Sequence, residues 1–291
     1  MVVDLDIPII NKINYQVSDL VLVGTVNQGN NNQRYFVLDF IRRPAIGFLF
    51  IIFIVLVLVI TKKQGIMSIL GMGFSFLVIF YFILPKILSG ADPVGASILG
   101  SLLIIPVSFS LSHGLNKKTI AAVIGTLIAL IITGVLADLF VKLGYLTGYA
   151  SEEASFLEIS HYGLINMRGL LLAGILIGVL GVLDDIAVSQ AAIVFQLKKT
   201  NKNLTLDTIY KKAMLIGEDH IASMVNTLVL VYTGASLPLL LLFLNNSQSF
   251  LTILNYEIVA QEIIRTLVGS IGLILSVPIT TFISVMMVKE K

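Results

Sequence analysis

Long apolar segments alternate with short polar ones along most of the chain. Seven apolar runs stand at about residues 45–60, 66–88, 94–112, 119–141, 164–197, 213–244 and 265–288. A helix needs roughly 20 apolar residues to cross ~30 Å of hydrocarbon, because each residue adds only ~1.5 Å. The pattern therefore predicts an all-α polytopic membrane protein with about seven transmembrane helices in a helical domain at 45–291. The fifth and sixth runs are longer than a bilayer requires, so we expect each to tilt, break or extend beyond the membrane.

Residues 1–44 follow a different pattern. They hold two stretches of alternating apolar and polar residues, "YQVSDLVLVGTVN" and "QRYFVLDFIRR", around "QGNNNQ". Such alternation about a turn is typical of a β-hairpin, and a lone hairpin is too small to have a core of its own. We predict that 1–44 is a short extracytoplasmic β-like segment preceding the transmembrane domain.

The composition fits this class. Hydrophobic residues make up 57% of the chain and charged residues only 12%, against about 25% charged in soluble domains. There is no cysteine, which excludes disulfides and thiolate metal sites. A net charge of +2 does not indicate a nucleic-acid partner. The partner that the composition indicates is the lipid bilayer.

The basic residues predict how the helices are oriented. If the N-terminus is outside, the loops on the inner side hold eleven of the 19 basic residues: Lys62, Lys63, Lys117, Lys118, Lys198, Lys199, Lys202, Lys211, Lys212, Lys289 and Lys291. The outer side beyond residue 44 then holds Lys86, Lys142, Arg168 and Arg265. Cytoplasmic loops are enriched in Lys and Arg, so we predict N-out and C-in. Arg42 and Arg43 count against this orientation.

Two adjacent carboxylates, Asp184 and Asp185, interrupt the fifth apolar run in "GVLDDIAVSQAA". A charge at the centre of a bilayer costs at least ~2.5 kcal/mol, so intramembrane acids usually mark an ion path or a binding site. Two neighbouring carboxylates also repel each other. They can share a proton, release it when a cation binds, or be neutralised by a metal. The alternative is structural, with the pair capping or breaking an overlong helix.

Small residues precede this acidic pair on the same helix. Gly174 and Gly178 are four residues apart and Gly181 follows one turn later. Such small-residue faces let a neighbouring helix approach closely, so we predict that these glycines pack against another helix. Asp185 continues roughly the same face.

The sixth run contains a polar stripe. Asp219, Ser223, Asn226 and Thr233 recur at helical spacing, and His220 and Thr227 form a second row. Unsatisfied polar groups in hydrocarbon cost several kcal/mol each, so the stripe must face protein or water.

We expect the polar residues of the fifth and sixth runs to lie at similar depth in the membrane. Asp185 lies about 20 Å along a helix from Lys198, and Asp219 lies about 10 Å from Lys212. Consecutive helices usually neighbour each other. We therefore predict one proton, cation or substrate site at the following residues: Asp184, Asp185, Asp219, His220 and Asn226. The sequence leaves open whether a proton, a monovalent or a divalent cation is bound.

Three motifs, "GVLDDIAVSQAA", "GEDHIASMVNTLVLVYTGASLPLL" and "SHGLNKKT", resemble the YibE/F family over roughly residues 20–288. The resemblance implies a multi-pass protein of the bacterial cytoplasmic membrane, mostly in organisms with Gram-positive envelopes. It implies a location rather than an activity. Family members usually carry an extra anchor and a longer extracytoplasmic β-rich module, of which residues 1–44 resemble the last strands.

Three function classes follow from these observations. A transporter, permease or channel-like subunit is the reading that intramembrane acids favour. An accessory or assembly subunit would use the polar stripe to bind a partner helix, in a homo-oligomer or with a related membrane subunit. An intramembrane metalloenzyme would use the carboxylates and His220 as ligands, but the chain shows no HExxH motif. We assign no catalytic residue. Neither a GxxxxGK[ST] loop nor a GxGxxG motif is present, which argues against an ATP-driven pump on this chain alone.

Overall fold

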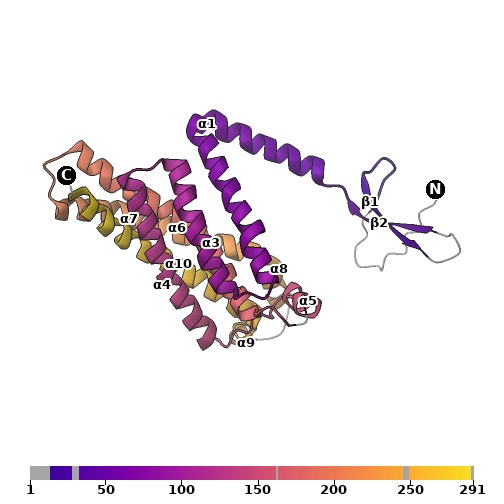
Figure 1. Ribbon diagram of the computed structural model, residues 1–291. Coiled ribbons are helices and arrows are strands. Elements are labelled where there is room, and N and C mark those ends of the chain that lie inside the picture. Colours follow the sequence, from indigo (N-terminus) through magenta and orange to yellow (C-terminus); the bar gives the residue numbers. More distant parts are fainter. Residues whose placement is uncertain (1–13, 28–32, 162, 245–248, 290–291) are drawn as a thin grey trace. The chain divides into compact units, whose positions relative to one another are not determined.

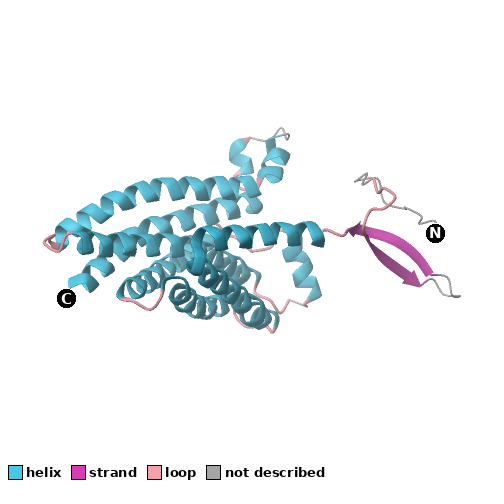
Figure 2. Cartoon of the chain, turned by 90° about the horizontal axis from the view of Figure 1, so that it is seen from above, coloured by secondary structure: helices cyan, strands magenta, loops and turns pink. Residues whose placement is uncertain are grey.

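The computed structural model describes residues 14–27, 33–161, 163–244 and 249–289. The chain divides into two compact units, Met1–Ile66 and Met67–Lys291. Figure 1 shows the elements of each unit, and Figure 2 shows strands only in the first of them. The "QGNNNQ" turn (except Gln33) and the basic residue Lys291 lie outside the described residues.

The first unit contains a two-stranded antiparallel hairpin. Strand β1 (Val21–Asn27) pairs with β2 (Gln33–Phe40), and the register shifts by one residue between Leu22 and Val23. Large apolar side chains, including those of Leu22, Val23 and Leu38, are exposed on the hairpin. The predicted β-hairpin is therefore present, and it has no core of its own, as expected for two strands.

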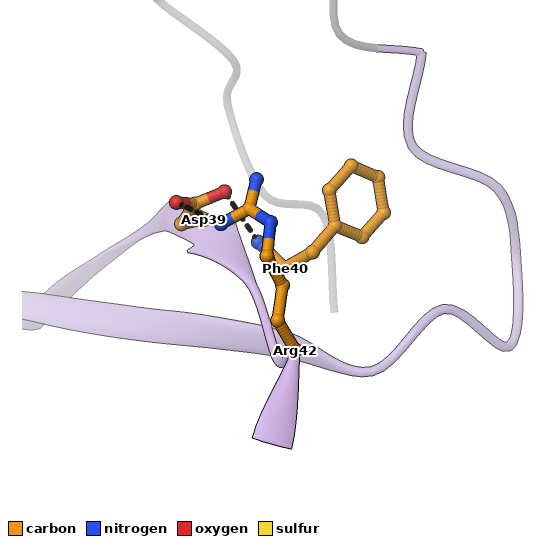
Figure 3. Close-up of polar contacts among 3 residues, drawn as sticks. All are labelled: Asp39, Phe40 and Arg42. Atoms are coloured by element: carbon orange, nitrogen blue, oxygen red, sulfur yellow. Dashed lines mark hydrogen bonds and ion pairs between the residues drawn. The ribbon is translucent and has the colours of Figure 1, made fainter. Parts of the chain in front are cut away.

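An ion pair joins the end of the hairpin to the start of the first helix. Arg42 Nη1 donates a 2.5 Å hydrogen bond to Asp39 Oδ2, and the Phe40 backbone N–H donates to Asp39 Oδ1 at 2.8 Å (Figure 3). These hydrogen bonds to the charged form, that from Arg42 first, hold the pKa of the Asp39 carboxyl below its ordinary value. The pair thereby ties strand β2 to helix α1.

Helix α1 (Arg43–Val78) is interrupted near its middle. Lys62 has φ 53° and ψ −126°, a left-handed conformation that is uncommon for a residue other than glycine. The helix continues through the π-helical turn η1 (Ile79–Ile83) into α2 (Leu84–Leu88). The first two predicted spans thus form one broken helix of 46 residues, and the described residues contain six helices able to span a membrane. The count of seven stays a prediction that depends on a turn at Lys62.

The second unit contains the end of α1 with η1 and α2 and, beyond these, five long helices (Figure 1). They are α3 (Pro93–His113), α4 (Lys117–Leu143), α6 (Met167–Thr200), α7 (Leu206–Ala235) and α10 (Glu257–Lys289). Four of them begin at a residue whose side chain accepts a hydrogen bond from the first turn: Asp92, Asn116, Asn166 and Thr205. Such caps satisfy backbone N–H groups that have no partner within the helix.

Helices α4, α6 and α10 form the core of the second unit, with α3 and α7 packed beside them. The antiparallel helices α4 and α10 approach closely because each offers a glycine to a threonine of the other. Gly125 lies against Thr280, and Gly272 lies against Thr133. Small-residue packing of this kind is typical of membrane helices. It occurs here on α4 and α10, away from the glycines that the sequence singled out.

The sixth apolar run is broken rather than continuous. Helix α7 ends at Ala235, and a short helix α8 (Leu237–Leu244) follows after Ser236. Pro238 in the first turn of α8 supplies the reason, because its ring and missing N–H prevent α7 from continuing. Two further short helices, α5 (Glu152–Ser160) and α9 (Phe250–Ile253), lie in the connections at this end of the unit.

A carboxylate secures this end of the bundle. Glu257, at the start of α10, accepts hydrogen bonds from the backbone N–H groups of Thr147 and Gly148 at 2.5 and 2.9 Å. The Thr147 hydroxyl donates to the same carboxylate. The loop after α4 is thereby joined to a helix that begins 110 residues later in the chain.

Candidate proton or cation site

The two adjacent carboxylates lie at the middle of helix α6. Asp184 is 17 residues after Met167 and 16 before Thr200, which places it roughly 25 Å from each end. Asp184 is half-buried, whereas Asp185 is exposed. Among the described residues, neither carboxylate takes part in a hydrogen bond or an ion pair. Two charged acids at mid-helix without such partners are costly in an apolar environment. Either protonation or an interaction with another group must therefore offset this cost.

An imidazole from another helix, that of His113, influences Asp185. The imidazole of His113 and the Asp185 carboxyl interact electrostatically, and Lys118 acts on the same imidazole. The parallel course of α3 and α6 explains this proximity, because Pro93 at the start of α3 packs against Gly169 at the start of α6. His113 ends α3 and thus reaches the depth of the acidic pair. The sequence analysis did not include His113 in the site, since the only signal for it is the register of two helices that are distant in the chain.

The polar stripe predicted on the sixth run is present on α7. Asp219, His220 and Asn226 are all exposed, as are Ser223 and Thr233. No other described element covers this row. The stripe therefore forms an open polar face on the second unit, about 20 Å long from Asp219 to Thr233 at ~1.5 Å per residue.

Two contacts set the register of α6 against α7. Gln190 Nε2 donates to the carbonyl oxygen of Ala213 at 2.8 Å, and the hydroxyl of Tyr232 lies against Gly178. The helices are thus antiparallel neighbours. Interpolation between the two contacts places Asp185 and Asp219 within about one helical turn, ~5 Å, along the axis. Similar depth is established by the register, while a single cleft shared by both carboxylates stays a prediction.

The three predicted packing glycines lie on an open face of α6. Gly174, Gly178 and Gly181 are exposed, and no other atom would meet a Cβ at Gly174 or Gly181 within 4 Å. Only Gly178 has a neighbour there, the Tyr232 hydroxyl. Packing of these glycines against a further helix therefore stays a prediction, and this face continues to the exposed Asp185.

Gln190 is a buried polar residue that sequence reasoning missed. It is fully buried, and its Nε2 donates to both the Ala213 carbonyl and Thr281 Oγ1, at 2.8 and 2.7 Å. Its Oε1 atom has no partner among the described residues. The signal in the sequence was an amide in an apolar run, five residues after Asp185. Its position shows that the inward face of α6 differs from the face that carries Asp185.

The described residues contain no group of three or more His, Cys, Asp or Glu side chains that could hold a metal ion. The possible ligands are the carboxylates of Asp184, Asp185 and Asp219, the imidazoles of His113 and His220, and the hydroxyl and amide groups of α7. Carboxylates and an imidazole can bind and release protons near neutral pH when their surroundings adjust their affinity.

Comparison with known proteins identifies the family. The family described as YibE/F-like protein matches residues 49–290, which is most of the chain, so the chain belongs to the YibE/F-like family. The resemblance drawn from the motifs is thereby confirmed. Together with six long apolar helices, it makes the chain an integral membrane protein. No curated protein and no solved structure matches the chain.

Proposed function

We propose that this member of the YibE/F-like family is a transport subunit of the bacterial cytoplasmic membrane, N-out and C-in, that moves protons or cations along the polar face of α6 and α7. The observation that carries the proposal is the position of Asp184 and Asp185. They stand at mid-helix in a long apolar segment without a hydrogen-bond or ion-pair partner among the described residues. Acids retained there at a cost of several kcal/mol favour an ionic function over a structural one.

The surroundings support a proton or cation path. His113 acts electrostatically on Asp185, and an imidazole can take up and release protons near neutral pH. Asp219 and His220 lie at a similar depth on α7, and Asn226 continues the row toward the other end. A row of carboxylate, amide and hydroxyl groups offers successive weak oxygen ligands, which is what an ion needs to enter a site and leave it again.

Flux measured in proteoliposomes tests the proposal. Vesicles carrying the full chain and a pH-sensitive dye are subjected to a proton or sodium gradient. We expect Asp185→Asn to keep expression and folding but to reduce flux to that of empty vesicles. Ser189→Ala, one turn further along the helix, is the matched control and should leave flux unchanged. If Asp184→Asn and Asp185→Asn both leave the flux and its pH dependence unaltered, the acids are structural and the proposal fails.

A second candidate function is that of an accessory or assembly subunit. The exposed polar face of α7 favours it, because a partner helix from a second copy or a related membrane subunit would satisfy Asp219, Ser223 and Asn226. In this case the chain alone shows no flux. Cross-linking from a cysteine at Ser223 would then capture a partner in the membrane, whereas a transport subunit that works alone would give none.

A further inference from the structure

A hollow of about 1600 Å³ opens at one end of the second unit. It lies where α4 and α7 begin and where α6 and α10 end, so residues from four helices line it. This is the end that the positive-inside rule places at the cytoplasmic surface. The volume exceeds the ~300–1,000 Å³ typical of pockets for small ligands.

The rim of the hollow is basic. Six lysines line it: Lys117, Lys118, Lys198, Lys199, Lys202 and Lys289. The described residues that line the hollow include no Asp or Glu. Charges of one sign that share a concave surface repel each other and concentrate anions there. The clustered lysines therefore favour binding of an anion in the hollow.

The helix ends do not decide the sign of the electrostatic potential in the hollow. The starts of α4 and α7 contribute partial positive charge, and the ends of α6 and α10 contribute partial negative charge of similar size. These contributions offset each other, so the lysine side chains set the potential. Lys198 also has a structural role, since its Nζ donates to the carbonyl oxygens of Lys202 and Leu204 and closes the turn between α6 and α7.

The floor of the hollow is apolar, because its apolar lining residues are mostly half-buried whereas four of its six lysines are exposed. Ile193 and Phe195 of α6, Leu206 of α7 and Met287 of α10 contribute to it. A soluble anion gains nothing from such a floor, whereas a phospholipid places its phosphate at the basic rim and its acyl chains against the apolar surface. Basic pockets between helices at the cytoplasmic side of a membrane bind lipid headgroups in this way.

We propose that this hollow binds an anionic phospholipid of the leaflet at which α4 and α7 begin. The phosphate lies among Lys118, Lys199 and Lys202, and the acyl chains follow the side chains between α6 and α10. Binding stabilises the junction of four helices whose lysines otherwise repel one another. The proposal is independent of any transport activity.

The test compares lipids and lysines in the full-length chain. Nanodiscs of phosphatidylcholine, with or without phosphatidylglycerol, are used to measure the thermal unfolding temperature and the lipid retained in native mass spectrometry. We expect the anionic lipid to raise the unfolding temperature and to remain bound. The triple variant K118Q/K199Q/K202Q should bind it at least about tenfold more weakly, since the phosphate loses three cationic neighbours at the membrane surface.

A matched variant separates the hollow from the general surface charge. K63Q/K211Q/K212Q removes the same number of charges from the same predicted side but from residues outside the hollow, and it should bind the lipid as the wild type does. The charge-preserving variant K118R/K199R/K202R should retain binding, which excludes misfolding as the cause of a loss. Equal losses in both glutamine variants would overturn the proposal. Stabilisation by inorganic phosphate in phosphatidylcholine nanodiscs, equal to that by the lipid, would also overturn it in favour of a soluble anion.

Discussion

Gln190 Nε2 donates a 2.8 Å hydrogen bond to the carbonyl oxygen of Ala213, which joins α6 to α7 in the interior of the bundle. The same amide nitrogen reaches Thr281 Oγ1 of α10 at 2.7 Å. One fully buried side chain thus holds three helices in register. This register also decides that Asp185 and Asp219 lie at similar depth.

We predict that Gln190→Leu lowers the free energy of unfolding by roughly 1–2 kcal/mol, because it removes both hydrogen bonds at nearly constant volume. Urea or thermal unfolding of the purified chain in detergent measures the loss. Gln196→Leu is the control, since Gln196 is exposed on the same helix and should change stability little. Equal stability of the two variants would mean that Gln190 does not hold α6 in place.

The topology is open to a direct test because the chain has no native cysteine. For seven spans with N-out and C-in, we expect single cysteines at Val17 and Ser155 to react with a membrane-impermeant maleimide in intact cells. Cysteines at Gln64 and Asn201 should react only after the membrane is opened. A cysteine at Val17 that is protected, with one at Ser155 still reactive, would indicate six spans and a continuous helix across Lys62.

Much of the fold could be predicted from the sequence, for a physical reason. Apolar runs of 20 residues or more have few alternatives to a membrane helix, and the starts and ends of α3, α4 and α6 follow the predicted runs within a few residues. The break after Ala235 was also foreseeable from Pro238. The interruption at Lys62 falls in the polar gap between the first two predicted runs. The residue that adopts the positive φ could not be foreseen, since a lysine has no intrinsic preference for it.

The site was harder to predict, because in a membrane helix both the lipid-facing and the buried face are apolar. Periodicity identified the polar row from Asp219 to Thr233, but it could not show that no other described element covers this row. Gln190 and His113 depend on the registers of α6 against α7 and α3, and these registers arise from contacts between residues far apart in the chain. Gly174 and Gly181 of α6 look like Gly125 of α4 and Gly272 of α10 as sequence, yet of these four only Gly125 and Gly272 lie against another helix among the described residues.

The imidazole beside the acidic pair gives a separate prediction. If His113 accepts a proton from Asp185, His113→Phe keeps the fold but slows proton flux in proteoliposomes and alters its pH profile between about pH 5 and 8, where histidine titrates. His161, in a connection at the other end of the bundle, is the control, and His161→Phe should leave the profile unchanged. An unaltered profile in His113→Phe would show that the proton takes another route.

The ion pair between Arg42 and Asp39 leads to a prediction about the titration of the Asp39 carboxyl. Because Arg42 stabilises the charged form, the Asp39 carboxyl should titrate below its ordinary pKa of 3.8. Its contribution to stability is therefore present above this value and is lost as the pH falls through the pKa of the folded state. Carboxyl NMR titration of ¹³C-aspartate in the full chain checks this, and Arg42→Gln should move the Asp39 pKa back toward the ordinary value. No change in Arg42→Gln would contradict the pair.

Two glycines of similar appearance should respond oppositely to the same substitution. We predict that Gly125→Ala lowers the free energy of unfolding by about 1–3 kcal/mol, because the new methyl group meets Thr280 in the close α4–α10 contact. Gly174→Ala meets nothing within 4 Å and replaces a poor helix former, so it should be neutral or stabilising by up to about 1 kcal/mol in the isolated chain. Unfolding in detergent compares the stability of the two variants, and cross-linking in membranes measures association of the chain with a second helix. A Gly174→Ala variant that unfolds normally in detergent but no longer cross-links in membranes would place the α6 glycines at an interface with a second helix.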